Sequence, residues 1–310
     1  MGPLARTGIG VALACGVLAT AVGIERNSDS DDNKGQSKGP YVALGDSYTS
    51  GPGIPTQNGT PAGCQRSNRN YPTLVAKALG IKAADFHDVS CSGATTTDLT
   101  APQHTGNGTN PAQLATLSAS VRLITLGIGG NDIGFSSMIT TCVTTGVLFK
   151  VADKFADISG KAPCKEKYST GGNGTDEVAR KIHATGDRLT RSLHEIKQRA
   201  PQAQVYVIGY PAILPAEGTD CGNKLPLAPG DVTFLRKKTQ QLNTMLSERA
   251  KAAGAGFVDT FAPSTGHDAC SPAATRWIEP LRPSSPAAAV HPNERGEQGM
   301  ATAVLHALED

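Results

Sequence analysis

The chain has 310 residues, of which 38% are hydrophobic, and a formal net charge of +2. This length suffices for one large soluble domain with a substantial core. Because the basic residues are scattered, without charged runs or interleaved aromatic residues, we exclude a nucleic-acid partner.

The first 24 residues are typical of a secretory signal. Residues 8–24 are almost entirely apolar, Arg6 precedes them, and Ala19-Thr20-Ala21 offers small residues for cleavage. The alternative is an uncleaved anchor facing outside, although so short a segment rich in Gly and Ala makes a weak span. Residues 25–39 are polar and without periodicity, which predicts a disordered linker. We expect a secreted protein with one domain over residues 40–310, acting as a monomer without an obligate protein partner.

The first expected strand leads directly into the candidate nucleophile. Residues 41–44, YVAL, form an apolar run that ends in Gly45-Asp46-Ser47-Tyr48. A buried strand followed by a tight turn would lift Ser47 into a cleft. A serine hydroxyl at its ordinary pKa is a poor nucleophile, so this assignment requires a base and an oxyanion site elsewhere in the chain.

Further strands and helices alternate along the chain. The other expected strands are Phe86–Val89, Val121–Leu126, Gln204–Ile208 and Gly256–Val258. Expected helices cover Tyr71–Leu79, a segment from Asp132 as its cap towards Val143, most of Thr175–Ala200, a long segment capped by Asp231, and about Asn293 to Leu308. Residues 100–111 are turn-rich, 151–174 and 211–229 are expected to be irregular insertions, and 259–292 an irregular rim of the active site.

This alternation predicts a three-layer α/β/α sandwich with a parallel, flavodoxin-like sheet of about five strands. Ligands of such sheets bind beyond the carboxyl ends of the strands. Ser47, Gly93 and Asn131 follow the first three strands, so we expect them to meet there.

Four short blocks occur in order: GDSY at 45–48, SGA at 92–94, GGND at 129–132 and VHPN at 290–293. Their order and spacing resemble those of the four blocks in the SGNH, or GDSL-type, hydrolases. The segments LPL at 225–227, GHDAC at 266–270 and RWIEPL at 276–281 are similar to secreted lipases and esterases of actinomycetes. The resemblance implies a serine ester hydrolase that acts on lipid or other esters without a cofactor.

The resemblance implies Ser47 as nucleophile, His291 as base, and an oxyanion hole of the Ser47 and Gly93 amides with the Asn131 side chain. The residue types suit these roles, since histidine can carry the Ser47 proton to the leaving alcohol, glycine leaves its amide accessible, and asparagine is a neutral donor. The structural alternatives are a serine that caps a helix, a glycine that supplies a positive φ, and an asparagine that shapes a turn.

One position departs from the family pattern. The family usually carries aspartate three residues before the histidine, where this chain has Ala288. A main-chain carbonyl, most simply that of Ala288, could accept the Nδ1 proton instead, and the actinomycete branch is similar in using such a carbonyl. Trp277, the only tryptophan, either lines the acyl pocket or closes the rim over the core.

Six cysteines remain once Cys15 is removed with the signal, and an even count in an exported protein indicates disulfides. Fifteen pairings are possible. Pairing neighbours in order gives Cys64 with Cys91, Cys142 with Cys164, and Cys221 with Cys270. No CxxC-type spacing occurs, so we expect no metal.

Two other functions were weighed. The same site chemistry would serve a carbohydrate acetyl esterase. A phosphate-binding module without catalysis would need a loop such as GxxxxGK[ST], and the acidic Asp46 suits that role poorly.

Overall fold

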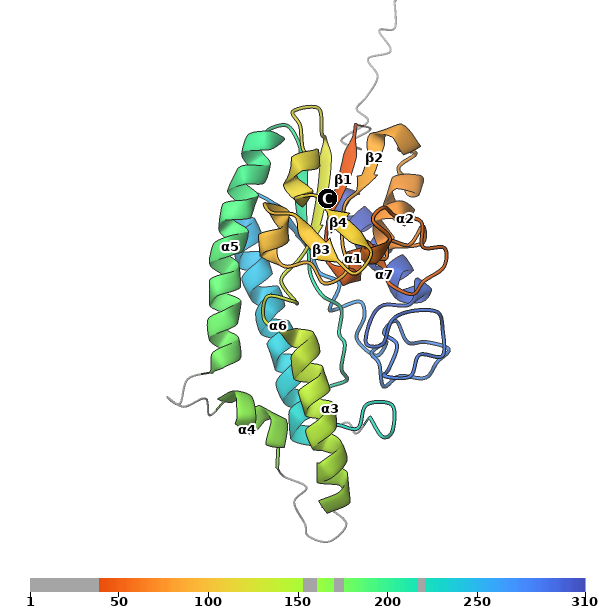
Figure 1. Cartoon of the computed structure of the whole chain (residues 1–310), viewed down its shortest axis with the longest axis vertical. Coiled ribbons are helices and arrows are strands. Elements are labelled where there is room, and N and C mark those ends of the chain that lie inside the picture. Colours follow the sequence, from red (N-terminus) through yellow and green to blue (C-terminus); the bar gives the residue numbers. More distant parts are fainter. Residues whose placement is uncertain (1–38, 153–160, 170–175, 217–220, 310) are drawn as a thin grey trace, which may run out of the picture. The chain divides into compact units, whose positions relative to one another are not determined.

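The computed structural model describes residues 39–152, 161–169, 176–216 and 221–309, so the expected signal and nearly all of the expected linker lie outside it. Five strands form one sheet in the order β2-β1-β5-β6-β7, and every neighbouring pair is parallel (Figure 1). These strands are β1 (Tyr41–Gly45), β2 (Phe86–Asp88), β5 (Leu123–Gly127), β6 (Gln204–Ile208) and β7 (Gly256–Val258). Counted along the chain, this is the 2-1-3-4-5 order of flavodoxin-like sheets, as predicted.

Helices cover both faces of the sheet. Successive side chains of a strand point to opposite faces, and β1 shows both cores. Val42 and Leu44 belong to the cluster that includes residues of α3 (Phe135–Ala152), α5 (Glu177–Arg199) and α6 (Pro229–Ala252). Tyr41 and Ala43 belong to the cluster with α2 (Tyr71–Ala78) and α7 (Glu294–Glu309). Burial on both faces explains why this strand is continuously apolar.

The remaining elements are short. They are α1 (Ser47–Ser50), α4 (Pro163–Ser169), the antiparallel hairpin of β3 (Gln103–Thr105) and β4 (Gly108–Asn110), and the 3-10 turns η1 (Ala62–Cys64), η2 (Ala83–Asp85), η3 (Thr96–Leu99) and η4 (Gln113–Thr116). The hairpin lies in the segment expected only to be turn-rich. The helix α4 corrects the expectation that residues 151–174 are irregular throughout.

Two aspartates expected to cap their own helices bind elsewhere. Helix α6 begins at Pro229, and the Asp231 carboxylate accepts hydrogen bonds from the backbone N–H groups of Cys164 (3.2 Å) and Lys165 (2.9 Å), in the first turn of α4. Helix α3 begins at Phe135, and Asp132 instead accepts a hydrogen bond from the Thr96 N–H (2.9 Å) and pairs with Arg188 (3.0 Å). Both carboxylates therefore join segments that are distant in sequence.

The three disulfides that join neighbouring cysteines are present. Cys64–Cys91 closes a loop before the segment that carries Gly93, Cys142–Cys164 joins α3 to α4, and Cys221–Cys270 ties the segment after β6 to the rim. Each closure contributes about 3 to 4 kcal/mol in the chain-entropy account.

Candidate active site

Ser47 is the first residue of α1, directly after β1. The turn requires a glycine before it, because a Cβ on Gly45 would lie 2.6 Å from the Gly127 carbonyl oxygen. The Asp46 N–H donates to that same carbonyl (2.9 Å), and the Gln113 side chain bonds both the N–H (2.8 Å) and the C=O (3.0 Å) of Gly45. Backbone packing at the sheet edge therefore fixes the position of Ser47.

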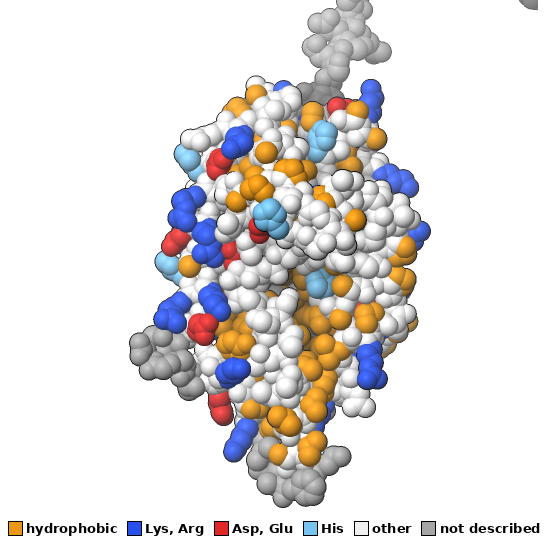
Figure 2. Space-filling view, in the orientation of Figure 1, with side chains coloured by type: hydrophobic (Ala, Val, Ile, Leu, Met, Phe, Trp, Pro, Cys, Tyr) orange, Lys and Arg blue, Asp and Glu red, His pale blue; other side chains and the backbone are white. Residues whose placement is uncertain are grey.

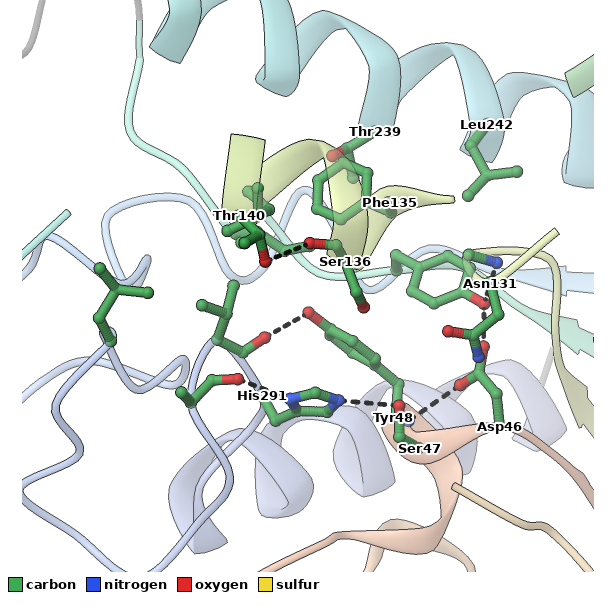
Figure 3. A pocket seen from close by; sticks show the side chains of 17 residues that line it. Asp46, Ser47, Tyr48, Asn131, Phe135, Ser136, Thr140, Thr239, Leu242 and His291 are labelled. Carbon is green, nitrogen blue, oxygen red and sulfur yellow. Dashed lines mark hydrogen bonds between the residues drawn. The ribbon is translucent and has the colours of Figure 1, made fainter. Parts of the chain in front are cut away.

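His291 lies beside Ser47 although 244 positions separate them: its Nε2 is 2.8 Å from the Ser47 Oγ (Figure 3). Its Nδ1 is 2.8 Å from the Ala289 carbonyl oxygen. Because a carbonyl only accepts, Nδ1 carries the proton and Nε2 presents its lone pair to Ser47. Burial lowers the pKa of His291 below its ordinary value of 6.5, which keeps the imidazole neutral at neutral pH.

The carbonyl acceptor was expected to be that of Ala288, and this detail was wrong. The Ala288 carbonyl accepts the backbone N–H of His291 itself at 3.3 Å. That turn directs the next carbonyl along the chain, of Ala289, towards the ring. The expectation of a main-chain acceptor is confirmed; its residue shifts by one.

Tyr48 supports the segment that carries the histidine. Its hydroxyl donates to the Val290 carbonyl at 2.7 Å, and its ring centroid lies 5.1 Å from that of His291. Val290 has φ +60°, a left-handed conformation that is unusual for a β-branched residue. Such outliers persist where the surrounding contacts determine them, as the Tyr48 hydroxyl does here.

A buried ion pair holds the same segment from the other side. Arg276 and Glu279 are 4% and 0% exposed and pair at 2.8 Å. The Glu279 backbone accepts from the Val290 N–H (2.9 Å) and donates to the His291 carbonyl (3.0 Å). The Asn293 side chain donates to the Glu279 carboxylate at 2.8 Å. The position of the base therefore depends on a charged network inside the rim.

The three expected oxyanion donors follow β1, β2 and β5. Asn131 donates from Nδ2 to the Ala94 carbonyl (2.9 Å), which uses one of its two amide hydrogens and ties it to the residue after Gly93. Gly93 has φ +81°, so this glycine also supplies the positive φ that was given as its alternative role. Within the described ranges, neither the Ser47 nor the Gly93 N–H donates to a protein acceptor. These amides remain available to a ligand.

Ser47 and His291 lie in the wall of a cavity of about 230 Å³. Phe135 and Thr140 of α3 lie across the cavity from them (Figure 3). Six of the lining side chains are large and apolar: Phe135, Ile139, Ile213, Leu242, Leu281 and Val290. An apolar cavity of this size beside a nucleophile suits the hydrocarbon part of a substrate.

Asp46 braces the turn. It caps α1 by accepting the Tyr48 N–H at 2.9 Å, and the Tyr210 hydroxyl donates to its second oxygen. Tyr210 also accepts the Gly130 N–H at 2.8 Å, which links this turn to the loop of Asn131. Burial raises the pKa of Asp46 to about 7.

Several supporting residues were missed by sequence reasoning. Nothing in the sequence indicates the roles of Tyr210, Arg276 and Glu279, whereas Tyr48 could have been suspected from its place next to Ser47. Trp277 stacks on His267 with ring centroids 5.3 Å apart and is not among the residues that line the cavity. It packs against Gly299 of α7, where a Cβ would lie 2.2 Å from the indole, so it closes the rim over the core.

The chain was also compared with known proteins. Residues 43–298 match the GDSL-like lipase/acylhydrolase family. Lipase 2 of Streptomyces coelicolor is 40% identical over 271 residues, which covers 86% of this chain and 85% of the relative. The crystal structure of phospholipase A1 from Streptomyces albidoflavus NA297 is similar with a TM-score of 0.68 and 29% identity, covering 86% of this chain and 98% of that one. An extracellular lipase from Streptomyces rimosus has a TM-score of 0.68 and 27% identity, covering 87% and 99%.

Proposed function

Because this chain belongs to the GDSL-like lipase/acylhydrolase family and is a carboxylic ester hydrolase, we propose that it cleaves lipid esters through an acyl-enzyme on Ser47. The observation that carries this proposal is the distance of 2.8 Å between Ser47 Oγ and His291 Nε2 in the wall of an apolar cavity. The hydroxyl and its base are already in hydrogen-bond contact, the geometry that general-base catalysis requires.

The reaction proceeds in two halves. In the first, Ser47 Oγ attacks the ester carbonyl while its proton passes to His291 Nε2, and the leaving alcohol takes that proton as the C–O bond breaks. In the second, water attacks the acyl-enzyme, gives a proton to His291, and releases the carboxylic acid as Ser47 regains its hydrogen. The Ser47 and Gly93 amides with the Asn131 side chain stabilise the oxyanion in both halves, each donor being worth about 3 to 4 kcal/mol.

The imidazolium formed in each half has a peptide carbonyl at Nδ1 rather than a carboxylate. The Ala289 oxygen keeps the ring in the correct tautomer and orientation, but it supplies only a partial negative charge to the cation. The Ala289 carbonyl therefore orients the His291 ring and does not neutralise its positive charge. The burial that lowers the pKa of His291 also favours return of the proton to the leaving alcohol.

The cavity favours a lipid acyl group over the acetyl group of a carbohydrate ester. Six of its lining side chains are large and apolar, and its volume of about 230 Å³ far exceeds that of one methyl group. Chain-length profiling with nitrophenyl esters from two to sixteen carbons, against acetylated xylan, separates the two. Faster turnover of acetylated xylan than of every longer ester would favour the carbohydrate esterase.

We also propose that the protein acts outside the cell. Three disulfides support this, since disulfides persist in oxidising compartments, and so does the apolar segment at residues 8–24 of the sequence. Mass spectrometry of protein recovered from culture medium would test both export and cleavage. Recovery only from the membrane fraction with residues 1–24 retained would favour the anchored alternative.

Covalent labelling tests the nucleophile. The wild-type protein treated with diisopropyl fluorophosphate should give one adduct, mapped by peptide mass spectrometry to Ser47. Ser47→Ala should lose both the adduct and turnover, whereas Ser120→Ala, the same change at an exposed loop, should keep both. Undiminished turnover in Ser47→Ala, or an adduct at another serine, would contradict the assignment.

A further inference from the structure

Helix α3 carries a cluster of exposed apolar side chains. Val147, Leu148 and Val151 are 47%, 67% and 55% exposed, and among the described residues they are the only large hydrophobic side chains with such exposure. We call these three residues the apolar patch. Single exposed hydrophobic residues are ordinary on a protein surface, but a cluster confined to five consecutive positions of one helix indicates a binding surface.

The whole helix is unusually apolar for its position. It has 18 residues, no acidic residue and a single lysine, Lys150. By length and composition it could cross a membrane, yet only 28% of it is buried. Met138, Cys142 and Phe149 pack it against the domain, so α3 is an integral helix of the fold with one apolar face towards solvent.

That face is continuous with the mouth of the catalytic cavity. Residues 136, 140, 143, 147 and 151 follow one another at spacings of three or four and therefore share one side of the helix. Ser136 and Thr140 line the cavity, whereas Val147 and Val151 belong to the apolar patch. Figure 2 shows hydrophobic side chains continuing from the hollowed centre of this face towards the far end of α3.

The helix that adjoins α3 exposes lysines. The Cys142–Cys164 disulfide joins α3 to α4, where Lys165 and Lys167 are exposed with Glu166 between them. Apolar side chains at the acyl boundary and ammonium groups at the phosphates are the combination by which proteins bind at the surface of a phospholipid layer.

We propose that the apolar patch docks the enzyme on the surface of a phospholipid aggregate, with the cavity mouth facing the lipid from which it draws its ester. This inference rests on the proposed lipid-ester function. A second copy of the chain is the competing occupant of the face. The lysines and the continuity with the cavity favour lipid, since a dimer across this face would place another protein beside the path of the substrate.

The test separates docking from chemistry. In a Ser47→Ala background, which prevents hydrolysis, binding to vesicles of phosphatidylcholine with phosphatidylglycerol is measured by co-sedimentation. Replacing Val147, Leu148 and Val151 together by serine should weaken binding about tenfold or more, because three apolar side chains no longer enter the interface. With Ser47 intact, the same triple variant should hydrolyse a monomeric, soluble short-chain nitrophenyl ester at the wild-type rate and vesicle phospholipid more slowly.

A gain-of-binding variant guards against a folding defect. Thr144 is exposed between the cavity and the apolar patch, so Thr144→Leu should strengthen vesicle binding several-fold without changing soluble ester turnover. Equal vesicle binding by wild type, the triple variant and Thr144→Leu would overturn the inference. The inference would also be overturned if light scattering showed the wild type to be a dimer and the triple variant a monomer, while vesicle binding stayed the same. If the wild type did not hydrolyse the soluble ester at all, the proposed function would be contradicted instead.

Discussion

Asp46 should make the stability of this fold depend on pH. Its carboxyl is 1% exposed, and burial raises its pKa to about 7 from an ordinary value of 3.8. The folded state therefore holds this proton more tightly than the unfolded chain does. The resulting stabilisation is fully present below about pH 4 and is lost as the pH rises through about 7. At about 1.4 kcal/mol for each pKa unit, the difference amounts to about 4 kcal/mol.

Asp46→Asn isolates this contribution. The amide oxygen can still accept the Tyr48 N–H, so the cap of α1 remains, but the side chain no longer titrates. Urea unfolding of both proteins, with disulfides intact, is measured between pH 4 and pH 8. The free energy of unfolding of the wild type should fall by about 4 kcal/mol relative to the variant across this range.

The direction in which the free energy of unfolding changes with pH decides between the possible results. Asp187→Asn, the same replacement at an exposed side chain, is the matched control and should leave the pH dependence of the wild type intact. Parallel curves for the wild type and Asp46→Asn would refute the reasoning. A wild type that gains stability relative to the variant as the pH rises would show that the folded state prefers the ionised carboxylate.

The remaining predictions concern catalysis and the covalent framework. The acid limb of kcat/KM on a soluble ester should have its midpoint below pH 6.5, because burial lowers the pKa of His291; a midpoint above 6.5 would contradict this. Asn131→Ala should lower kcat by about 10² to 10³ with folding unchanged by circular dichroism, and an unaltered kcat would remove it from the oxyanion hole. Tyr48→Phe keeps the ring but loses the hydroxyl contact beside the base, so kcat should fall about tenfold at constant KM, whereas a change in KM alone would argue for a substrate contact. Replacing Cys64 and Cys91 together by serine should lower the free energy of unfolding by about 3.5 kcal/mol in urea titrations, because the bridge closes a loop of 27 residues; an unchanged value would show that other contacts restrain this loop.

The central strands β1 and β5 could be predicted because they are buried on both faces and therefore appear as short continuous apolar runs. The strands Gln204–Ile208 and Gly256–Val258 have the predicted bounds, and the parallel pairing follows from alternation with helices. The contact between Ser47 and His291 was foreseen from the resemblance to the SGNH hydrolases, which implied these two residues as nucleophile and base.

The errors at the two expected helix caps share one physical cause, which is contact between distant segments. Asp132 and Asp231 look like local helix caps, yet their partners lie 36 to 67 positions away in the chain. Local capping preferences cannot reveal partners that are brought close only by folding. The Tyr210 hydroxyl on Asp46 and the buried pair of Arg276 and Glu279 escaped prediction for the same reason.

The acceptor of the His291 Nδ1 proton is a peptide oxygen, and this changes which positions a genetic screen can detect. Every amino acid at position 289 carries the same oxygen, so codon changes there cannot delete it. Sensitivity passes to the side chains that hold this stretch of main chain in place, Tyr48 on one side and Glu279 with Arg276 on the other. A saturation library should thus leave residue 289 tolerant of small side chains and show damaging substitutions at Arg276 and Glu279, which do not line the cavity.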